Sequence, residues 1–363
     1  MGRFRRGYNS YRGRRTITDI LKWIAIVLGV LVVLLVGVLV FGQDYLVFTD
    51  QGLQWRTPLA SGEQKEQTQG QQDVNVVIQP PAGSQDTQEE APAGSQTPEE
   101  MKAQELPVSA VVDGTAQGLL EQAGANTLIL EMKDSQGQLG WSSQSSLAVQ
   151  AGVNSSLEGV NEALQAWNQG EVYTVAKVCC FRDNTMPYQH NNMALRANYG
   201  NWRDEQKLRW MSPDSQEAVD YLAGLCGELA QLGFDELVLE YPAFPTQGNL
   251  EAIQANGSYA SGSFATAVEH FLTQIEQAVE PYGTVISLQV TRDQVEQQGE
   301  ASGLTGAVLE RYAQRVWVEE DGLEPTVSQL VESGGDASVQ LQIVQLQTNE
   351  QGQWNALGLL PET

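Results

Sequence analysis

The fold is decided by the stretch Phe234-Asp235-Glu236-Leu237-Val238-Leu239-Glu240-Tyr241-Pro242-Ala243-Phe244-Pro245, in which a helix is followed at once by a short apolar strand. Upstream, Ser212-Pro213 resembles a helix N-cap and first helical residue, apolar residues recur at helical spacing over 214–232, and Gly233 supplies the stop. The strand ends on Glu240, which lies in phase with the apolar Val238. A unit of helix, turn and buried strand is typical of α/β proteins.

Strand-like and helix-like runs alternate from Leu106 to the C-terminus. The predicted strands are 108–112, 127–132, 172–180, 236–241, 284–290, 315–318, 338–346 and 355–360. The predicted helices are 116–122, 157–167, 214–232, 264–279, 307–313 and 326–332. This order predicts a (β/α)8 TIM-like barrel over residues 106–363, close to the ~250 residues typical of that fold. A missing last helix predicts a barrel that is incomplete at its C-terminal end, and a doubly wound open sheet is the alternative.

The N-terminal region is predicted to anchor the chain in a membrane. Residues 1–22 form a tail with seven basic side chains and one acidic one, and residues 23–42 contain no charge. Some 20 apolar residues cross a hydrocarbon core of ~30 Å, whereas the apolar core of a cleaved signal peptide has only ~7 to 15 residues. We therefore expect a transmembrane helix with a cytoplasmic N-terminus and an extracytoplasmic body, and a cleaved signal peptide is the alternative.

Residues 43–105 are predicted to form a juxtamembrane segment and a linker. A strand and turn are expected near Tyr45 to Gly52, and 61–105 is rich in Gln, Glu, Gly, Pro, Ser and Thr, a composition that favours disorder. The whole chain has a net charge of −25, so the part after the basic tail has −31. So acidic a body is not expected to bind nucleic acid.

Four charged residues are expected to point into the barrel, because each lies in phase with an apolar residue of its own strand: Glu131, Lys133, Lys177 and Glu240. Buried charges are costly unless they are paired, so these two acids and two bases predict an ion-pair network. The network either fills the barrel or faces a substrate, and the sequence leaves both open.

Several motifs resemble a bacterial glycoside hydrolase-like barrel family that was long classed as a domain of unknown function. Beside the opening stretch, they are Glu131-Met132-Lys133-Asp134, Lys177 with Phe181-Arg182-Asp183, and Trp202-Arg203-Asp204 with Trp210. The chain departs from the pattern in four places: Glu240 replaces an aspartate, Ala243 replaces an arginine, Gln289 replaces an aspartate, and 317–321 replaces a Pro-Met-apolar-Tyr-Pro run. The resemblance implies a TIM barrel that acts on cell-wall or extracellular polysaccharide.

A glycosidase of the usual kind needs two carboxylates. We expect Glu240 to be one, and Glu320 or Asp321 the other, with Glu131 and Asp134 as further choices. The expected substrate-binding residues are Glu131, Lys133, Asp134, Lys177, Arg182, Asp183, Trp202, Arg203, Asp204, Trp210 and Tyr241. A barrel that binds glycan or a cell-envelope protein without catalysis is the alternative.

Other chemistries find little support in the sequence. The two histidines, His190 and His270, have no metal-site spacing, and no cofactor motif occurs, so neither metal nor cofactor is expected. Cys179, Cys180 and Cys226 lie in apolar runs and are interpreted as core residues. The long segment 182–211 is rich in aromatic and basic residues, which is typical of a sugar-binding loop.

Overall fold

The computed structural model describes residues 46–49, 52–55, 100–253, 259, 261–334, 341–348 and 353–359. The chain divides into two compact units, Met1–Asp86 and Thr87–Thr363. In the first, β1 (Leu46–Thr49) pairs antiparallel with β2 (Gly52–Trp55), which confirms the strand predicted there. The predicted membrane span 23–42 lies outside the described residues. Among the helices that are described, none has the length and apolar character needed to cross a membrane.

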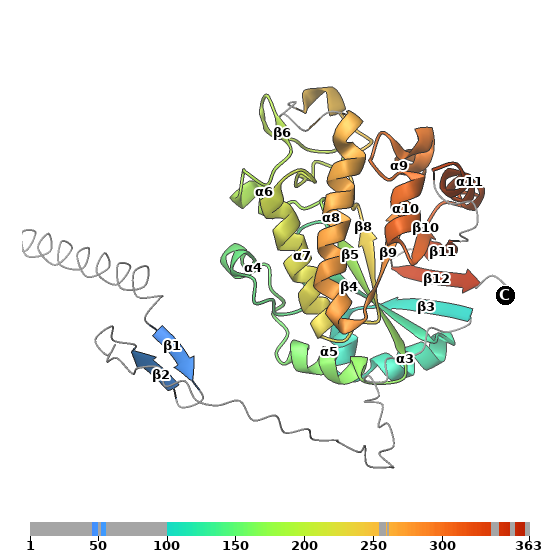
Figure 1. The fold of residues 1–363 in the computed structure, drawn as a ribbon. Helices are drawn as coiled ribbons and strands as arrows, with labels where there is room; N and C mark the ends of the chain where they lie inside the picture. Colours follow the sequence, from blue (N-terminus) through green and yellow to red (C-terminus); the bar gives the residue numbers. More distant parts are fainter. Residues whose placement is uncertain are drawn as a thin grey trace, which may run out of the picture. The chain divides into compact units, whose positions relative to one another are not determined.

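The second unit contains a closed barrel of eight strands, in the order β10-β11-β12-β3-β4-β5-β8-β9 (Figure 1). The strands are β3 (Glu100–Leu106), β4 (Thr127–Lys133), β5 (Tyr173–Cys179), β8 (Glu236–Glu240), β9 (Val285–Val290), β10 (Arg315–Val318), β11 (Gln342–Thr348) and β12 (Trp354–Leu359). The predicted α/β barrel is therefore confirmed, and the open sheet is excluded.

The first barrel strand differs from the prediction. Residues 108–112 form the helix α2 (Val108–Val112), not a strand, and the first strand is β3, which begins six residues inside the predicted linker. Met101 and Ala103 alternate with exposed residues and enter the barrel core, so a polar composition conceals a real strand. The barrel therefore begins at Glu100, not at residue 106.

The C-terminal end closes the barrel in an unusual way. β11 and β12 form an antiparallel hairpin, and β12 also runs antiparallel to β3, while the other neighbouring pairs are parallel. This agrees with the missing last helix, because an antiparallel return needs only a short turn whereas a parallel one needs a crossover. The barrel is complete, with one reversed strand.

Helices surround the barrel (Figure 1). They are α3 (Ala116–Ala123), α4 (Ser146–Ala151), α5 (Val160–Asn168), α6 (Met186–Gln189), α7 (Gln216–Gln231), α8 (Phe264–Val279), α9 (Arg292–Val295), α10 (Gly306–Tyr312) and α11 (Glu324–Gly334). The N-cap of α7 is Ser215, whose side chain accepts a hydrogen bond from the Ala218 N–H, so the cap predicted at Ser212 is wrong.

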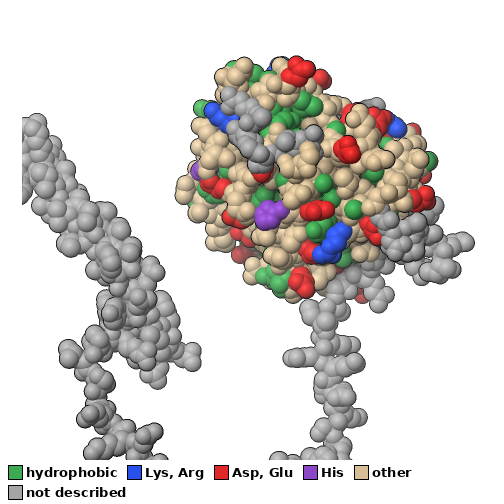
Figure 2. Space-filling model, turned by 45° about the horizontal axis from the view of Figure 1, so that its top comes forward, with side chains coloured by type: hydrophobic (Ala, Val, Ile, Leu, Met, Phe, Trp, Pro, Cys, Tyr) green, Lys and Arg blue, Asp and Glu red, His purple; other side chains and the backbone are tan. Residues whose placement is uncertain are grey.

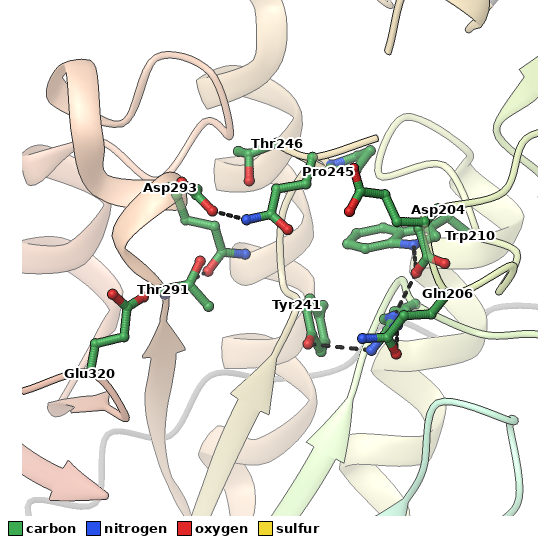
Figure 3. Close-up of a pocket in the computed structure, with 13 residues that line it drawn as sticks. Asp204, Gln206, Trp210, Tyr241, Pro245, Thr246, Thr291, Asp293 and Glu320 are labelled. Carbon is green, nitrogen blue, oxygen red and sulfur yellow. Dashed lines mark hydrogen bonds and ion pairs between the residues drawn. The ribbon is translucent and has the colours of Figure 1, made fainter. Parts of the chain in front are cut away.

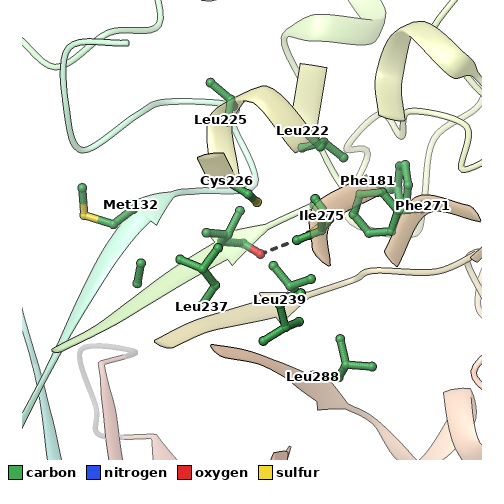
Figure 4. Close-up of a cluster of buried hydrophobic side chains, with 14 of the residues drawn as sticks. Met132, Phe181, Leu222, Leu225, Cys226, Leu237, Leu239, Phe271, Ile275 and Leu288 are labelled. Atoms are coloured by element: carbon green, nitrogen blue, oxygen red, sulfur yellow. Dashed lines mark hydrogen bonds between the residues drawn. The ribbon is translucent and has the colours of Figure 1, made fainter. Parts of the chain in front are cut away.

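The core between β8 and helices α7 and α8 fixes the position of the strand that ends on Glu240. Leu237 and Leu239 lie close to side chains of both helices, among them Leu222, Cys226 and Ile275 (Figure 4). All of these residues are fully buried, and burial of one such side chain contributes about 1.5–3 kcal/mol. The three cysteines are buried free thiols, as predicted.

Candidate active site

Glu240 lies at the C-terminal end of β8, where the chain turns sharply. It is partly buried, and its carbonyl accepts a hydrogen bond from the Cys180 N–H at 2.8 Å, which extends the pairing of β8 with β5. The next residue, Tyr241, has φ +48° and precedes Pro242, a conformation that a non-glycine residue rarely adopts. Such strain is often found at functional sites.

A cluster of charged groups lies on the same barrel end, around Lys177. Its Nζ is 3.1 Å from Glu105 Oε1 and 3.1 Å from Glu131 Oε1, and it lies over the Trp354 ring at 4.6 Å from the centroid. The Trp354 N–H also donates to Glu105 at 2.8 Å. The predicted network is therefore present, with Glu105 as a member that the sequence interpretation had assigned to the linker.

Lys133 does not belong to this cluster. The pairing of β4 with β5 shifts register between Glu131 and Lys133, so strand phase no longer holds there. Lys133 is fully buried, with its Nζ 2.8 Å from Asp183 Oδ2 and 2.7 Å from the Cys179 carbonyl. Asp183 also accepts from the Thr185 and Met186 N–H groups. This pair holds the loop after β5, and the prediction that Lys133 faces the barrel interior is wrong.

Burial raises the pKa of Glu240 to about 7; the Lys177 ammonium opposes this shift, and the carboxylates of Glu131, Glu105 and Glu319 add to it. For Lys177, burial acts to lower the pKa, but the surrounding carboxylates, Glu240 first, raise it above the usual lysine value. Glu240 can therefore hold a proton near neutral pH while Lys177 stays charged.

Glu319 is a candidate that strand phase could have identified. On β10, Arg315 and Trp317 both reach Glu236 inside the barrel, so the next residue in phase is Glu319, not Glu320. Glu320 instead pairs with the Arg292 guanidinium at 3.0 Å, and both side chains are partly exposed. Asp321 is exposed and, like Glu240 and Glu319, does not line either of the two cavities described below.

Two cavities lie at the C-terminal ends of the strands. The Lys177 cavity, of about 320 Å³, is lined by Glu105, Leu106, Pro107, Val108, Glu131, Lys177 and Gln353. The Tyr241 cavity, of about 230 Å³, is lined by Arg182, Asp204, Glu205, Gln206, Trp210, Tyr241, Pro245, Thr246, Gln247, Thr291, Asp293, Gln294 and Glu320 (Figure 3). Together they are lined by residues of loops and strand ends far apart in the sequence.

In the Tyr241 cavity, four of the predicted substrate-binding residues come together, and Glu320 also lines it. Arg182 Nε donates to Asp204 at 2.8 Å, and its Nη1 donates to the Tyr241 hydroxyl at 3.4 Å. Trp210 Nε1 donates to the same Asp204 oxygen at 3.2 Å, and its ring lies 5.5 Å from that of Tyr241 (Figure 3). Aromatic rings beside fixed polar groups suit a sugar ring.

Other predicted residues lie elsewhere. Trp202 is fully buried and donates to the Asn249 carbonyl at 2.8 Å, so it offers no face for stacking and its predicted contact with sugar is wrong. Arg203 donates to the Lys207 carbonyl and lines neither cavity. Asp134 accepts from the Gln136 and Gln138 N–H groups in a tight turn. No cluster of metal-ligating side chains occurs within the described ranges.

A comparison with curated protein sequences gives no match. Among solved structures, the chain is similar to a hypothetical protein from Ruminiclostridium thermocellum (23% identity, 51% of this chain, 95% of that one, TM-score 0.43). It is also similar to the PgaB (BpsB) glycoside hydrolase domain from Bordetella bronchiseptica (12% identity, 64% of this chain, 80% of that one, TM-score 0.46). A family model described as "Putative glycosyl hydrolase domain" matches residues 109–317, more than half of the chain, and the chain belongs to that family.

Proposed function

We propose that this protein hydrolyses glycosidic bonds in a polysaccharide, with Glu240 as the general acid. The observation that carries the proposal is the position of Glu240 at the C-terminal end of a barrel strand, beside the Lys177 cluster. Active sites of such barrels are built at this end. Membership of the family supports a glycan-acting barrel.

Glu131 is the second carboxylate in this proposal. Its side chain is 45% exposed, so water or a sugar can reach it, and the Lys177 ammonium lies 3.1 Å from its Oε1 atom. A protonated Glu240 would donate to the glycosidic oxygen while the Glu131 side chain attacks the sugar or activates water. Glu319, which also acts on Glu240, is the other choice.

We also propose that the protein acts outside the cell membrane, anchored by residues 23–42. The apolar length of that segment and the basic tail before it support this placement. The substrate would then be a cell-wall or extracellular polysaccharide.

The second candidate function is glycan binding without hydrolysis. It is favoured by Ala243 and Gln289, both buried, which stand where the resemblance implies an arginine and an aspartate. In addition, Lys177 engages both Glu105 and Glu131, so these carboxylates could serve only to hold the barrel end together.

The test is hydrolysis of a panel of wall and extracellular glycans by the wild-type chain and four variants. Glu240→Gln should lower turnover by about 10² to 10⁴, the usual contribution of general acid catalysis, while binding survives. Glu131→Gln or Glu319→Gln should show a comparable loss, which identifies the second carboxylate. Glu276→Gln is the matched control, since it removes an acid on α8 that pairs with Arg311 and lines neither cavity. Turnover that is unchanged in Glu240→Gln would exclude the proposed mechanism, and binding without turnover would favour the second function.

A further inference from the structure

The basic side chains are distributed unevenly over the described residues. Seven of the eleven lysines and arginines form ion pairs with carboxylates: Lys102, Lys133, Lys177, Arg182, Arg292, Arg311 and Arg315. The other four have no ion pair within the described part of the chain, and all lie between residues 196 and 209: Arg196, Arg203, Lys207 and Arg209. In a chain of net charge −25, four unpaired cations in one segment require an explanation.

A contact joins one of these cations to an exposed tyrosine. The Arg209 guanidinium lies 4.6 Å from the centroid of the Tyr188 ring, and Arg209 pairs across the hairpin with Arg203. Arg203 in turn donates to the Lys207 carbonyl at 2.8 Å. Tyr188 is 66% exposed, so its ring is available beside the guanidinium.

The second tyrosine lies on the adjoining hairpin of β6 (Arg196–Ala197) and β7 (Gly200–Asn201). Tyr199 is in its turn and is 62% exposed. Asn201 accepts a hydrogen bond from Arg196 and donates to the Pro187 carbonyl, which precedes Tyr188. We call this surface the arginine lobe: Tyr188, Arg196, Tyr199, Arg203, Lys207 and Arg209.

The arginine lobe contains a repulsive contact. Arg203 and Arg209 are opposite each other in an antiparallel pair, where like charges destabilise the free protein. Burial lowers the pKa of Arg209, and the Arg203 charge acts in the same direction. A bound anion would remove this repulsion.

The lobe adjoins the candidate active site. Asp204, next to Arg203 in the same hairpin, binds Arg182 on the Tyr241 cavity, whereas Arg203 lines neither cavity. In Figure 1, β6 and α6 lie toward the end of the barrel at which the β8 arrow points. A polymer that enters the cavity could therefore continue onto the lobe. Elsewhere, acidic side chains are spread over the surface, as the face in Figure 2 shows.

We propose that the arginine lobe binds an anionic polysaccharide, with carboxylate or phosphate groups on the arginines and sugar rings on Tyr188 and Tyr199. The choice of a glycan rests on the proposed function, while the anionic character rests on the lobe alone. Guanidinium groups bind carboxylate and phosphate with directed hydrogen bonds, and exposed tyrosines offer flat faces to sugars.

The test is binding of the full-length chain to three polymers: polygalacturonate, its neutral methyl ester and a phosphomannan. We expect binding to polygalacturonate or the phosphomannan, weakened by salt, and none to the methyl ester. Which anionic polymer binds distinguishes carboxylate from phosphate. Arg203→Gln should weaken binding about tenfold, because one charge-assisted contact is lost. Arg311→Gln, which makes the same charge change on α10, should leave binding unchanged.

Three results would overturn the proposal. The first is equal binding of the polymer by Arg203→Gln, Arg311→Gln and wild type, and the second is binding of the methyl ester as tight as that of polygalacturonate. The third is binding of an oligonucleotide or an anionic vesicle that is tighter than that of either anionic polysaccharide and is weakened by Arg203→Gln. Lys207→Gln is a second variant of the lobe. Because Lys207 is exposed, this substitution should not disturb folding, and it should weaken polymer binding as Arg203→Gln does. Arg203→Gln should leave the Tm of the free protein nearly unchanged, since the lost bond to the Lys207 carbonyl is offset by relief of the repulsion, whereas removal of an arginine with only a structural role would lower it. Glu240→Gln should bind the anionic polymer as tightly as wild type does. The absence of hydrolysis and the absence of polymer binding by the lobe are therefore separate outcomes.

Discussion

At the scale of single residues, Glu240 should make stability depend on pH. Burial raises its pKa to about 7, so between about pH 4.5 and 7 the folded chain keeps a proton that the unfolded chain has lost. Its contribution to stability is fully present below about pH 4.5 and is lost as the pH rises through 7. We expect Glu240→Gln to gain stability relative to wild type across this window, by at least about 2 °C in Tm at pH 8.

Glu205→Gln is the control for this measurement, because it makes the same change from carboxyl to amide at an exposed position. A constant difference in Tm between Glu240→Gln and wild type from pH 4 to 8 would show that the Glu240 carboxyl is solvated as usual.

Lys177 should matter to stability more than any surface lysine. Its ammonium balances Glu105 and Glu131 in a buried setting, so Lys177→Met leaves carboxylates without a partner. We expect a loss of about 3 to 5 kcal/mol in the free energy of unfolding by urea. Lys102→Met, which breaks the exposed pair with Glu100, should cost less than about 1 kcal/mol. Equal effects of the two substitutions would contradict the buried network.

The alternation of side chains along each strand predicted part of this site. It failed where a register shift changes which side chains point inward. It placed Lys177 in the barrel interior correctly, because β5 is regular, but it failed for Lys133, where the register shifts. Strand phase could also have identified Glu319, but Glu320 and Asp321 were predicted instead, because the acidic run at 319–321 concealed which residue faces inward. Trp202 could not be predicted, since its burial depends on the loop that carries Asn249, far away in the sequence.

At the scale of elements, β3 should be indispensable. It pairs with β4 on one side and β12 on the other, and it supplies Glu105 to the Lys177 cluster. A chain that begins at residue 107 should therefore fail to give a cooperative thermal transition, whereas one that begins at residue 87, the start of the second compact unit, should unfold cooperatively. A cooperative transition in the shorter chain would show that the barrel closes without β3.

The same strand shows why element boundaries could not all be predicted. β3 has the composition of the linker before it, and only its partners on both sides make it a strand. The apolar run 108–112 suits a strand equally well by composition, but Pro107 ends β3 and the run forms α2, which buries Ala110 and Val111. By contrast, β10 and α8 have the predicted bounds, because long or strongly patterned segments depend less on context.

At the scale of the whole molecule, the order of charge along the chain carries the last prediction. The first 22 residues are basic, residues 23–42 are uncharged, and the rest has a net charge of −31. Because basic flanks stay in the cytoplasm, we expect the full-length protein to sediment with membranes and to resist extraction by high salt or carbonate. Protease added to intact cells should degrade the barrel and leave a short membrane-bound fragment that contains the N-terminus. An epitope tag before Met1 should therefore be protected and one after Thr363 should be lost.

A variant with two arginines placed within residues 23–42 is the control and should become soluble, since a charge at the bilayer centre costs about 2.5 to 3.5 kcal/mol. Recovery of a soluble wild-type form that begins near Gln43 would instead identify the segment as a cleaved signal peptide, and would leave the barrel outside the cell but not attached to it.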